Sequence, residues 1–167
     1  GFSELAFLAN YVDGIEVNST FYRPASPAAA EGWLRQVEKR PDFLFTAKLW
    51  QRFTHDPATE WTAEEAQTVR RGLQPLQRAG RLGAVLAQFP WSFHPEAAAF
   101  ARLRRLAEEF RDLPLVVEVR HADWNGAEGL AFLRERGMGF CNVDQPALRT
   151  NLAPTGVVTG PVGYCRF

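Results

Sequence analysis

Net charge and lysine are both scarce in this chain, and each shortage restricts what the protein can do. Lysine plus arginine and aspartate plus glutamate each number 19, so the 167 residues are formally neutral. A neutral chain has no overall field to attract nucleic acid or a membrane surface. Only Lys39 and Lys48 are lysine. Because a lysine can shift its pKa and take part in chemistry where an arginine cannot, Lys48 is a residue of interest.

Cysteine and long apolar runs are also scarce. Cys141 and Cys165 have no spacing typical of a metal or redox motif, which fits a reducing cytoplasm. No run approaches the roughly 18 apolar residues that suggest a membrane span. The first ten residues lack the basic region that precedes the apolar run of a signal peptide. We therefore expect a cytoplasmic protein that does not enter a membrane.

Short apolar segments alternate with longer amphipathic ones. The short segments are typical of strands buried on both faces and span 13–18, 43–48, 82–88, 113–120, 138–144 and 162–167. Between them lie helix signals: Ser26 precedes Pro27 as an N-cap, and Thr62 and Glu65 have capping-box spacing. Gly137 is a predicted C-cap. The alternation predicts one domain, residues 1–167, with a parallel sheet and helices outside it.

The two faces of each predicted strand differ in polarity. Residues i and i+2 share a face, and one face is apolar or small throughout. Cys141 and Cys165 fall on that face, where buried, unreactive thiols are expected. The other face becomes polar toward the carboxyl end and carries Glu16, Asn18, Thr46, Lys48, Gln88, Glu118, Arg120, Asn142, Asp144, Tyr164 and Arg166.

This polarity difference favours a barrel over an open sheet. An open doubly wound sheet has helices on both faces, so both faces should stay apolar, whereas a barrel directs one face into its lumen. We therefore predict an α/β fold of the TIM-type (β/α)8 class, with the polar face inside. Catalytic residues of such barrels lie at the carboxyl ends of the strands, where this polar column is found.

Acidic and basic residues balance on the polar face. The acids are Glu16, Glu118 and Asp144, and the bases are Lys48, Arg120 and Arg166. One interpretation is an ion-pair network that fixes the register of the strands. Buried ion pairs cost several kcal/mol of desolvation per ion and stabilise weakly compared with apolar packing. We therefore favour the other interpretation, a site for a polar ligand.

The loops after these strands are rich in aromatic and basic residues. They carry Phe21, Tyr22, Arg23, Trp50, Arg52, Phe53, His55, Trp91, Phe93, His94, His121 and Trp124. Such side chains hold sugars, bases or phosphates in binding sites. The alternative is that the aromatic rings seal the top of the barrel.

Six strings in this order resemble the YecE-like family, domain of unknown function 72. They are IEVNSTFYRPAS, FTAKLWQRFTH, AQFPWSFHP, VVEVRHADW, NVDQP and GYCRF. The resemblance implies a TIM-type barrel of unestablished activity. Family members begin with a strand carrying a GTSGW-like motif and continue past the RF string into an HGR-like stretch and a last strand. Neither is found here, so the resemblance implies a fragment that holds about strands two to seven of eight.

The first functional hypothesis is an enzyme that performs acid–base chemistry on a small anionic or polyhydroxylated substrate, as a hydrolase, lyase or isomerase would. Glu118 is the candidate general acid or base, with charge stabilisation by Lys48 and Arg120. Glu16 or Asp144 is the candidate partner carboxylate. His121 is a second candidate for proton transfer. The residues expected to bind substrate are Asn18, Tyr22, Gln88, Arg120, His121, Trp124 and Arg166.

Two other functions remain open, a nucleic-acid-binding or DNA-repair-like barrel and a non-catalytic binder of small molecules. The arginines and aromatics of the loops could stack bases, but the neutral charge and the lack of a lysine stripe speak against this. The sequence implies no cofactor. Glu16, Glu118, Asp144 and His121 are ligand types for divalent metals, yet Lys48, Arg120 and Arg166 would repel a cation. The oligomeric state is not indicated.

The implied absence of barrel closure generates a stability prediction. Closure removes the exposed edges of a sheet, so a barrel that lacks its first and last strands keeps unpaired backbone groups. We expect the 167-residue chain by itself to be poorly stable. A thermal melt checks this, and a cooperative unfolding transition at high temperature would contradict it.

Overall fold

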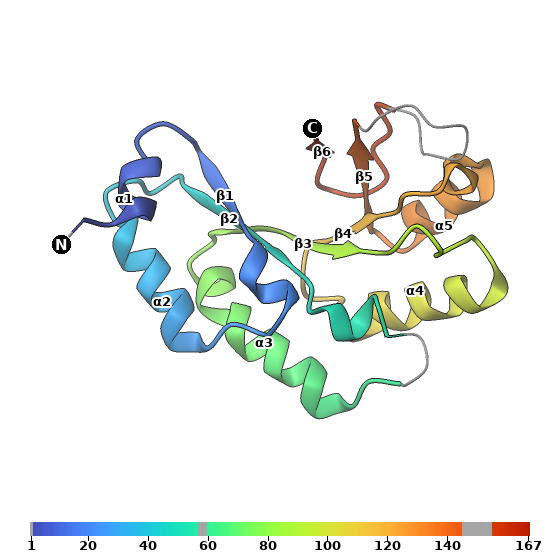
Figure 1. The fold of residues 1–167 in the computed structure, drawn as a ribbon, viewed down its shortest axis with the longest axis horizontal. Coiled ribbons are helices and arrows are strands. Elements are labelled where there is room, and N and C mark those ends of the chain that lie inside the picture. The colour runs from blue at the N-terminus through green and yellow to red at the C-terminus, as the bar shows by residue number, and fades with distance from the viewer. Residues whose placement is uncertain (1, 57–59, 145–154) are drawn as a thin grey trace.

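The computed structural model describes residues 2–56, 60–144 and 155–167, whose fold is shown in Figure 1. Six strands form one sheet in chain order, and every neighbouring pair is parallel. The strands are β1 Gly14–Val17, β2 Leu44–Lys48, β3 Leu82–Gln88, β4 Leu115–Glu118, β5 Gly139–Val143 and β6 Tyr164–Arg166. Each lies within one of the six predicted segments. The chain is therefore an α/β protein with the strand order of an incomplete TIM-type barrel.

Helices α2 to α5 connect successive strands from β1 to β5, and a short helix, α1, precedes β1. They are α1 Glu4–Leu8, α2 Pro27–Gln36, α3 Ala63–Arg78, α4 Ala97–Glu109 and α5 Ala127–Glu135. In Figure 1, α2, α3 and α4 all lie on the same side of the strands. Short 3-10 helices begin soon after three of the strands: η1 Asn18–Phe21, η2 Gln51–Phe53 and η3 Ala122–Asn125. Within the described residues, no helix has the length and apolar character that crossing a membrane requires.

The predicted helix signals act as expected. The Ser26 hydroxyl accepts a hydrogen bond from the Ala29 amide at the start of α2. At the start of α3, Thr62 Oγ1 accepts from the Glu65 amide at 3.2 Å, and Glu65 Oε2 accepts from the Thr62 amide at 2.7 Å. This reciprocal capping box satisfies two amides that the helix cannot pair internally. Gly137, after α5, has a φ of 65°, which suits glycine best.

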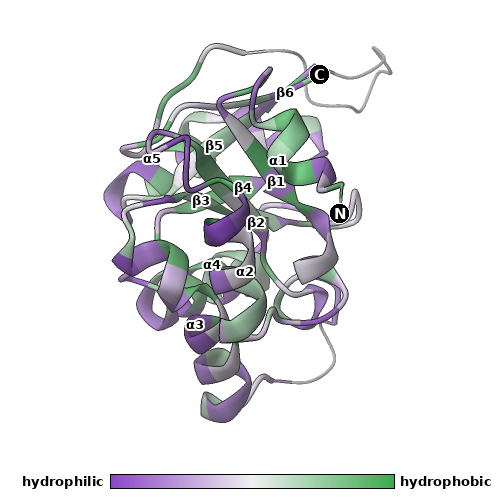
Figure 2. Ribbon diagram, turned by 90° about the vertical axis from the view of Figure 1, so that its left-hand side faces the viewer, coloured by the Kyte–Doolittle hydropathy of each residue, from purple (hydrophilic) through white to green (hydrophobic). Residues whose placement is uncertain are grey.

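The sheet has two chemically different faces. Most of the buried apolar side chains lie between the sheet and the helices and include Phe45, Val85 and Val117. Figure 2 shows hydrophobic colour along the strands and mixed colour along α3. A smaller apolar group, Ala84, Leu86, Val116, Cys141 and Val143, lies on the opposite face, below the polar strand ends. Burial of each large apolar side chain contributes roughly 1.5–3 kcal/mol, so the helix-facing core carries most of the stability.

The facing predicted for β5 is wrong. The register pairs Cys141 with Tyr164 and Val143 with Arg166, so these two side chains face the lumen with Tyr164 and Arg166. Asn142 therefore faces outward, and Asp144 is exposed. The Asn142 amide donates to the Val157 carbonyl at 3.0 Å and accepts from the Val157 amide at 3.1 Å. These two hydrogen bonds to backbone satisfy the Asn142 side chain outside the lumen.

The register also corrects the expectation for Cys165. Cys165 pairs with Asn142 and is exposed, whereas we expected a buried thiol under a helix. Cys141 is buried as expected, but in the lumen rather than against the helices.

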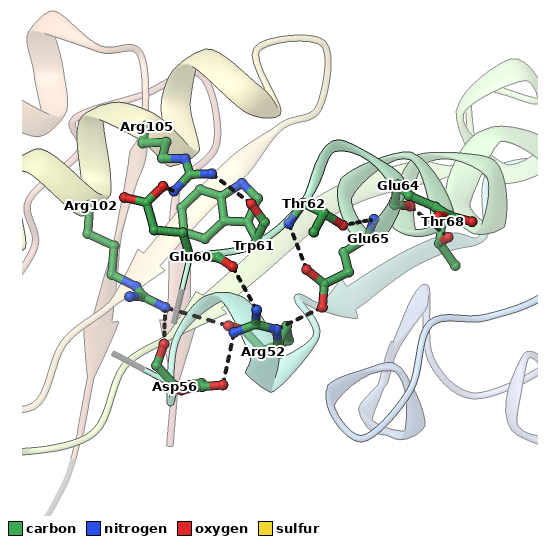
Figure 3. A network of polar contacts seen from close by, with 10 residues as sticks. All are labelled: Arg52, Asp56, Glu60, Trp61, Thr62, Glu64, Glu65, Thr68, Arg102 and Arg105. Atoms are coloured by element: carbon green, nitrogen blue, oxygen red, sulfur yellow. Dashed lines mark hydrogen bonds and ion pairs between the residues drawn. The ribbon is translucent and has the colours of Figure 1, made fainter. Parts of the chain in front are cut away.

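Arginines fix the long connection between β2 and α3, as Figure 3 shows. Arg52 donates to Glu65 Oε1, to Asp56 Oδ2 and to the Glu60 carbonyl, each at 2.8 Å. Arg102, from α4, donates to the Phe53 carbonyl at 2.9 Å and to the Asp56 carbonyl at 2.7 Å. We expected Arg52 in a loop above the lumen. Its side chain instead bonds to Glu65 at the start of α3.

Two helical glycines provide a stability test with opposite signs. A Cβ at Gly72 in α3 would lie 2.2 Å from the Ala25 carbonyl oxygen, so Gly72→Ala must displace backbone. A Cβ at Gly32 in α2 would meet only Arg35 Nη2, at 3.7 Å. We expect Gly72→Ala to destabilise by about 1–3 kcal/mol and Gly32→Ala to stabilise by about 0.5–1 kcal/mol. Urea unfolding measures both, and shifts of the same sign would contradict the packing described here.

Candidate functional site

Glu118, the last residue of β4, lies at the centre of a polar cluster in the lumen. Its side chain is 0% exposed. Arg166 Nη1 donates to Oε2 at 2.8 Å, Gln88 Nε2 donates to Oε1 at 3.0 Å, and Arg120 forms an ion pair with Oε1. Both carboxylate oxygens therefore have charged or amide donors. Such pairing offsets the desolvation cost of a buried carboxylate.

Glu16, on β1, forms the other half of this lumen cluster. Tyr164 Oη donates to Glu16 Oε2 at 2.6 Å, and Arg166 Nη2 donates to Oε1 at 3.3 Å. Lys48 Nζ lies 3.8 Å from the same Oε1. The Tyr164 hydroxyl is also 3.2 Å from Thr46 Oγ1 on β2. Side chains of β6 thus reach β1 and β2 at the other end of the strand order, as only a curved, barrel-like sheet permits.

The predicted convergence of charges is observed for most of the column. The lumen cluster brings together Glu16, Lys48, Gln88, Glu118, Arg120, Tyr164 and Arg166 from five of the six strands and their immediate ends. Asp144 and Asn142 are outside it because of the facing of β5. Sequence reasoning placed Tyr164 in the lumen but gave it no role. Because Tyr164 lies two residues before Arg166, the two side chains share a face of β6, and this spacing could have indicated a joint role.

The exposed part of the lumen cluster is mainly cationic. The exposed fractions of the side chains are 31% for Arg120, 29% for Arg166, 14% for Lys48 and 18% for Glu16, against 0% for Glu118. A ligand that enters the lumen therefore meets three positive groups and one carboxylate. This arrangement suits an anion that also carries a proton donor or hydroxyl group.

Burial and neighbouring charges shift two pKa values in the lumen cluster. Burial, and then the hydrogen bond donated to Glu16, raise the pKa of Tyr164 well above that of a free tyrosine. The phenol is therefore a proton donor throughout the physiological range. Burial alone would lower the pKa of Arg166, but the hydrogen bond and charge of Glu118, followed by the charge of Glu16, outweigh it and raise the pKa.

The remaining predicted binding residues lie elsewhere. Asn18 and Tyr22 are exposed in and after η1, and the Tyr22 ring packs edge-on against Phe21 at 5.3 Å. Trp124, which we expected to contact a ligand, has a fully buried side chain. Trp124 Nε1 donates to the Phe93 carbonyl at 2.6 Å, and the two rings stack at 5.3 Å. Both rings belong to the apolar core between the sheet and the helices.

His121 lies in the loop after β4 and faces Asp123 rather than the lumen cluster. Its Nδ1 is 3.2 Å from Asp123 Oδ2, and its ring packs against Trp91 and His94. Sequence reasoning did not associate these loop residues, because His94 and Asp123 follow different strands. Only the adjacency of β3 and β4 brings them together.

Comparison with known families agrees with these features. The sequence model of a family described as "Protein of unknown function DUF72" matches residues 2–167. The chain belongs to the DUF72 family. None of the curated proteins matches it at a significant level. The resemblance inferred from the six sequence strings is therefore confirmed.

Solved structures of DUF72 proteins share the fold. A DUF72 family protein from Thermotoga maritima MSB8 is 31% identical with a TM-score of 0.81, over 99% of this chain and 65% of that one. A DUF72 family protein from Enterococcus faecalis V583 is 23% identical with a TM-score of 0.85, over 95% of this chain and 66% of that one. The chain thus spans just under two thirds of the length of these relatives, which accounts for an incomplete barrel.

The lumen of this DUF72 chain also contains one thiol. Cys141 lies among apolar side chains beneath the lumen cluster. Burial, and then the negative charge of Glu118, raise its pKa to about 12. At neutral pH it is therefore a protonated thiol, and the thiolate that reacts with electrophiles is almost absent.

We expect the two thiols to react at different rates, because Cys165 is exposed and Cys141 is buried. Near neutral pH we expect a thiol-specific disulfide reagent to modify the exposed Cys165 rapidly and Cys141 only after unfolding. Counting released chromophore before and after denaturant measures this. Cys165→Ser is the matched control, which should abolish the rapid phase. Two rapidly reacting thiols per native chain would show that Cys141 is not buried in the lumen.

Proposed function

We propose that the lumen cluster binds a small anionic, hydroxylated substrate and performs acid–base chemistry on it. The supporting observation is that two partly exposed cations, Lys48 and Arg166, lie beside the partly exposed carboxylate of Glu16, while a third, Arg120, pairs with the neighbouring Glu118. Positive groups beside a partly exposed carboxylate favour a ligand with a charged end and a polar end. Hydrolases, lyases and isomerases of small metabolites use substrates of this kind.

Glu118 acts as a positioning residue in this proposal. Its carboxylate is fully buried and bonded to Arg120, Arg166 and Gln88, so it has no surface for a substrate and no oxygen without a donor. The first hypothesis, that Glu118 itself transfers a proton, is replaced on this ground. Glu118 instead holds two guanidinium groups in a fixed orientation, which reduces the entropy that anion binding costs.

Glu16 takes the role of general acid or base. It is the carboxylate of the lumen cluster with exposed surface, and it lies within 3.8 Å of Lys48 Nζ. The Tyr164 hydroxyl donates a hydrogen bond to Glu16 Oε2, which fixes the orientation of the carboxyl group. Lys48 and Arg166 then stabilise negative charge that develops when a proton leaves the substrate.

A non-catalytic binder of the same anions is the second candidate. The observation that favours it is the complete pairing of the carboxylates, since Glu16 accepts from both Tyr164 and Arg166. A carboxylate that already accepts from two donors has fewer lone pairs left to take a proton from a substrate. Turnover, rather than binding, separates the two candidates.

Thermal-shift screening of the native protein tests anion binding. The panel contains small carboxylates, aldonic acids and sugar phosphates, with neutral sugars of matched size as the reference compounds. We expect anions to raise the melting temperature and neutral sugars to leave it unchanged. Lys48→Met should weaken binding without breaking the pairs of Glu118, and Arg70→Met, on the outer face beside Glu109 and Asp112, should not affect it. Equal shifts with neutral sugars would contradict the proposal.

Glu16→Gln tests the chemistry once an anion is identified. We expect the variant to bind that anion and to lose about 10²–10⁴-fold in turnover, the usual contribution of a general acid or base. Unchanged turnover would remove Glu16 from the mechanism, and absence of turnover in the wild-type protein would leave the binder as the function.

A further inference from the structure

Two histidines and an aspartate gather at the rim of the barrel, beside the lumen cluster and outside it. His94 follows β3, and His121 and Asp123 follow β4. Each offers one ligand atom, and these atoms all lie within 4.8 Å of one another. In the part of the chain that the structure describes, no other group of three histidine, cysteine or acidic residues is close enough to hold a metal ion.

The contacts of His121 indicate a proton or a metal ion between its ring and Asp123. His121 Nδ1 accepts from the Asp123 amide at 3.4 Å, so this nitrogen carries a lone pair in the neutral ring. Asp123 Oδ2, also an acceptor, lies only 3.2 Å from the same nitrogen. Two acceptors at this distance repel each other unless a proton or a metal ion lies between them.

A metal ion accounts for the third residue, whereas a proton does not. Asp123 Oδ2 is also 4.0 Å from His94 Nδ1, and the two imidazole rings are 4.3 Å apart. A proton between His121 and Asp123 can belong to a neutral imidazole, and it leaves His94 without a role in the group. One divalent ion instead joins all three residues. Bonds of about 2.0–2.2 Å place ligand atoms roughly 3–4 Å apart, so these atoms, which lie within 4.8 Å of one another, move slightly closer together when the ion binds.

The surroundings differ from those of the lumen cluster in the way a metal site requires. The ion pairs of Asp123 within the described residues are to the two histidines, so no lysine or arginine is recorded as neutralising its carboxylate. By contrast, Glu16 and Glu118, which the sequence also offered as metal ligands, form ion pairs with lysine or arginine. The Trp91 ring packs edge-on against His94 at 5.5 Å and against His121 at 5.0 Å, which holds both rings in place.

We infer that His94, His121 and Asp123 bind a divalent first-row transition metal ion such as Zn²⁺. Two nitrogens and one carboxylate oxygen suit this class of ion better than Ca²⁺ or Mg²⁺, which prefer oxygen ligands. Three protein ligands leave at least one coordination position for solvent or a ligand atom. His94 also lines a cleft of about 420 Å³ together with Ser92, Glu96 and Arg102, so a ligand in this cleft would lie next to the ion.

Calorimetry with Zn²⁺ on chelator-treated native protein tests the site. We expect one ion per chain, and at least about tenfold weaker binding in His94→Ala and in Asp123→Asn. Both side chains are partly exposed, so these variants should fold. The chain has three histidines, and His55→Ala is the matched control because His55 lies outside the group of three. Circular dichroism melts of every variant verify folding.

Two spectroscopic readouts distinguish a specific site from loose adsorption. Co²⁺ should give visible absorption bands typical of four- or five-coordinate nitrogen and oxygen ligation, absent in Asp123→Asn. Cu²⁺ should quench tryptophan fluorescence stoichiometrically, and Trp91→Phe should reduce the quenching while it preserves Zn²⁺ affinity. No Zn²⁺ binding, or equal binding by wild type, His94→Ala and Asp123→Asn, would overturn the inference and leave a proton shared by His121 and Asp123. These outcomes do not depend on the anion-binding proposal.

Discussion

The guanidinium of Arg166 is the interaction on which the interior of this protein depends. One nitrogen donates to Glu118 on β4 and the other to Glu16 on β1, although Arg166 itself lies on β6. β6 pairs with β5 through only three residues, so its backbone ladder is short. The two charge-assisted hydrogen bonds connect it across the lumen to strands it does not pair with. The curvature that turns a row of parallel strands into part of a barrel is thus fixed by charge as well as by apolar packing.

Such an interior is expensive for a protein that needs only to fold. Buried ions lose several kcal/mol of hydration each, and apolar side chains of similar volume often stabilise more. The lower part of the same lumen avoids this loss of hydration, because the apolar side chains of Ala84, Leu86 and Val116 fill it. Polar residues replace apolar ones only at the carboxyl end of the strands. A change from apolar to charged residues along one strand face supports the proposed ligand site, because packing alone does not require it.

Much of this arrangement could be predicted from alternation along single strands, and the errors have physical causes. The facing of β1 to β4 and β6 was predictable because one face of each is apolar and the other polar. The facing of β5 was not, because its polar Asn142 and Asp144 indicated an inward face, whereas the apolar Cys141 and Val143 are the residues that face the lumen. The outward Asn142 is satisfied by the Val157 backbone, which sequence alone does not place nearby. Trp124 shows the same limit, since a loop aromatic serves equally as a pocket wall or as core.

The double use of Arg166 has a thermodynamic consequence. The side chain that holds β6 against β1 and β4 is also one that an incoming anion would contact. Binding at the lumen and docking of the sixth strand therefore draw on the same donors, so each equilibrium shifts the other by an equal free energy. If the proposed anion binds there, its concentration would control the degree of order at one end of the sheet.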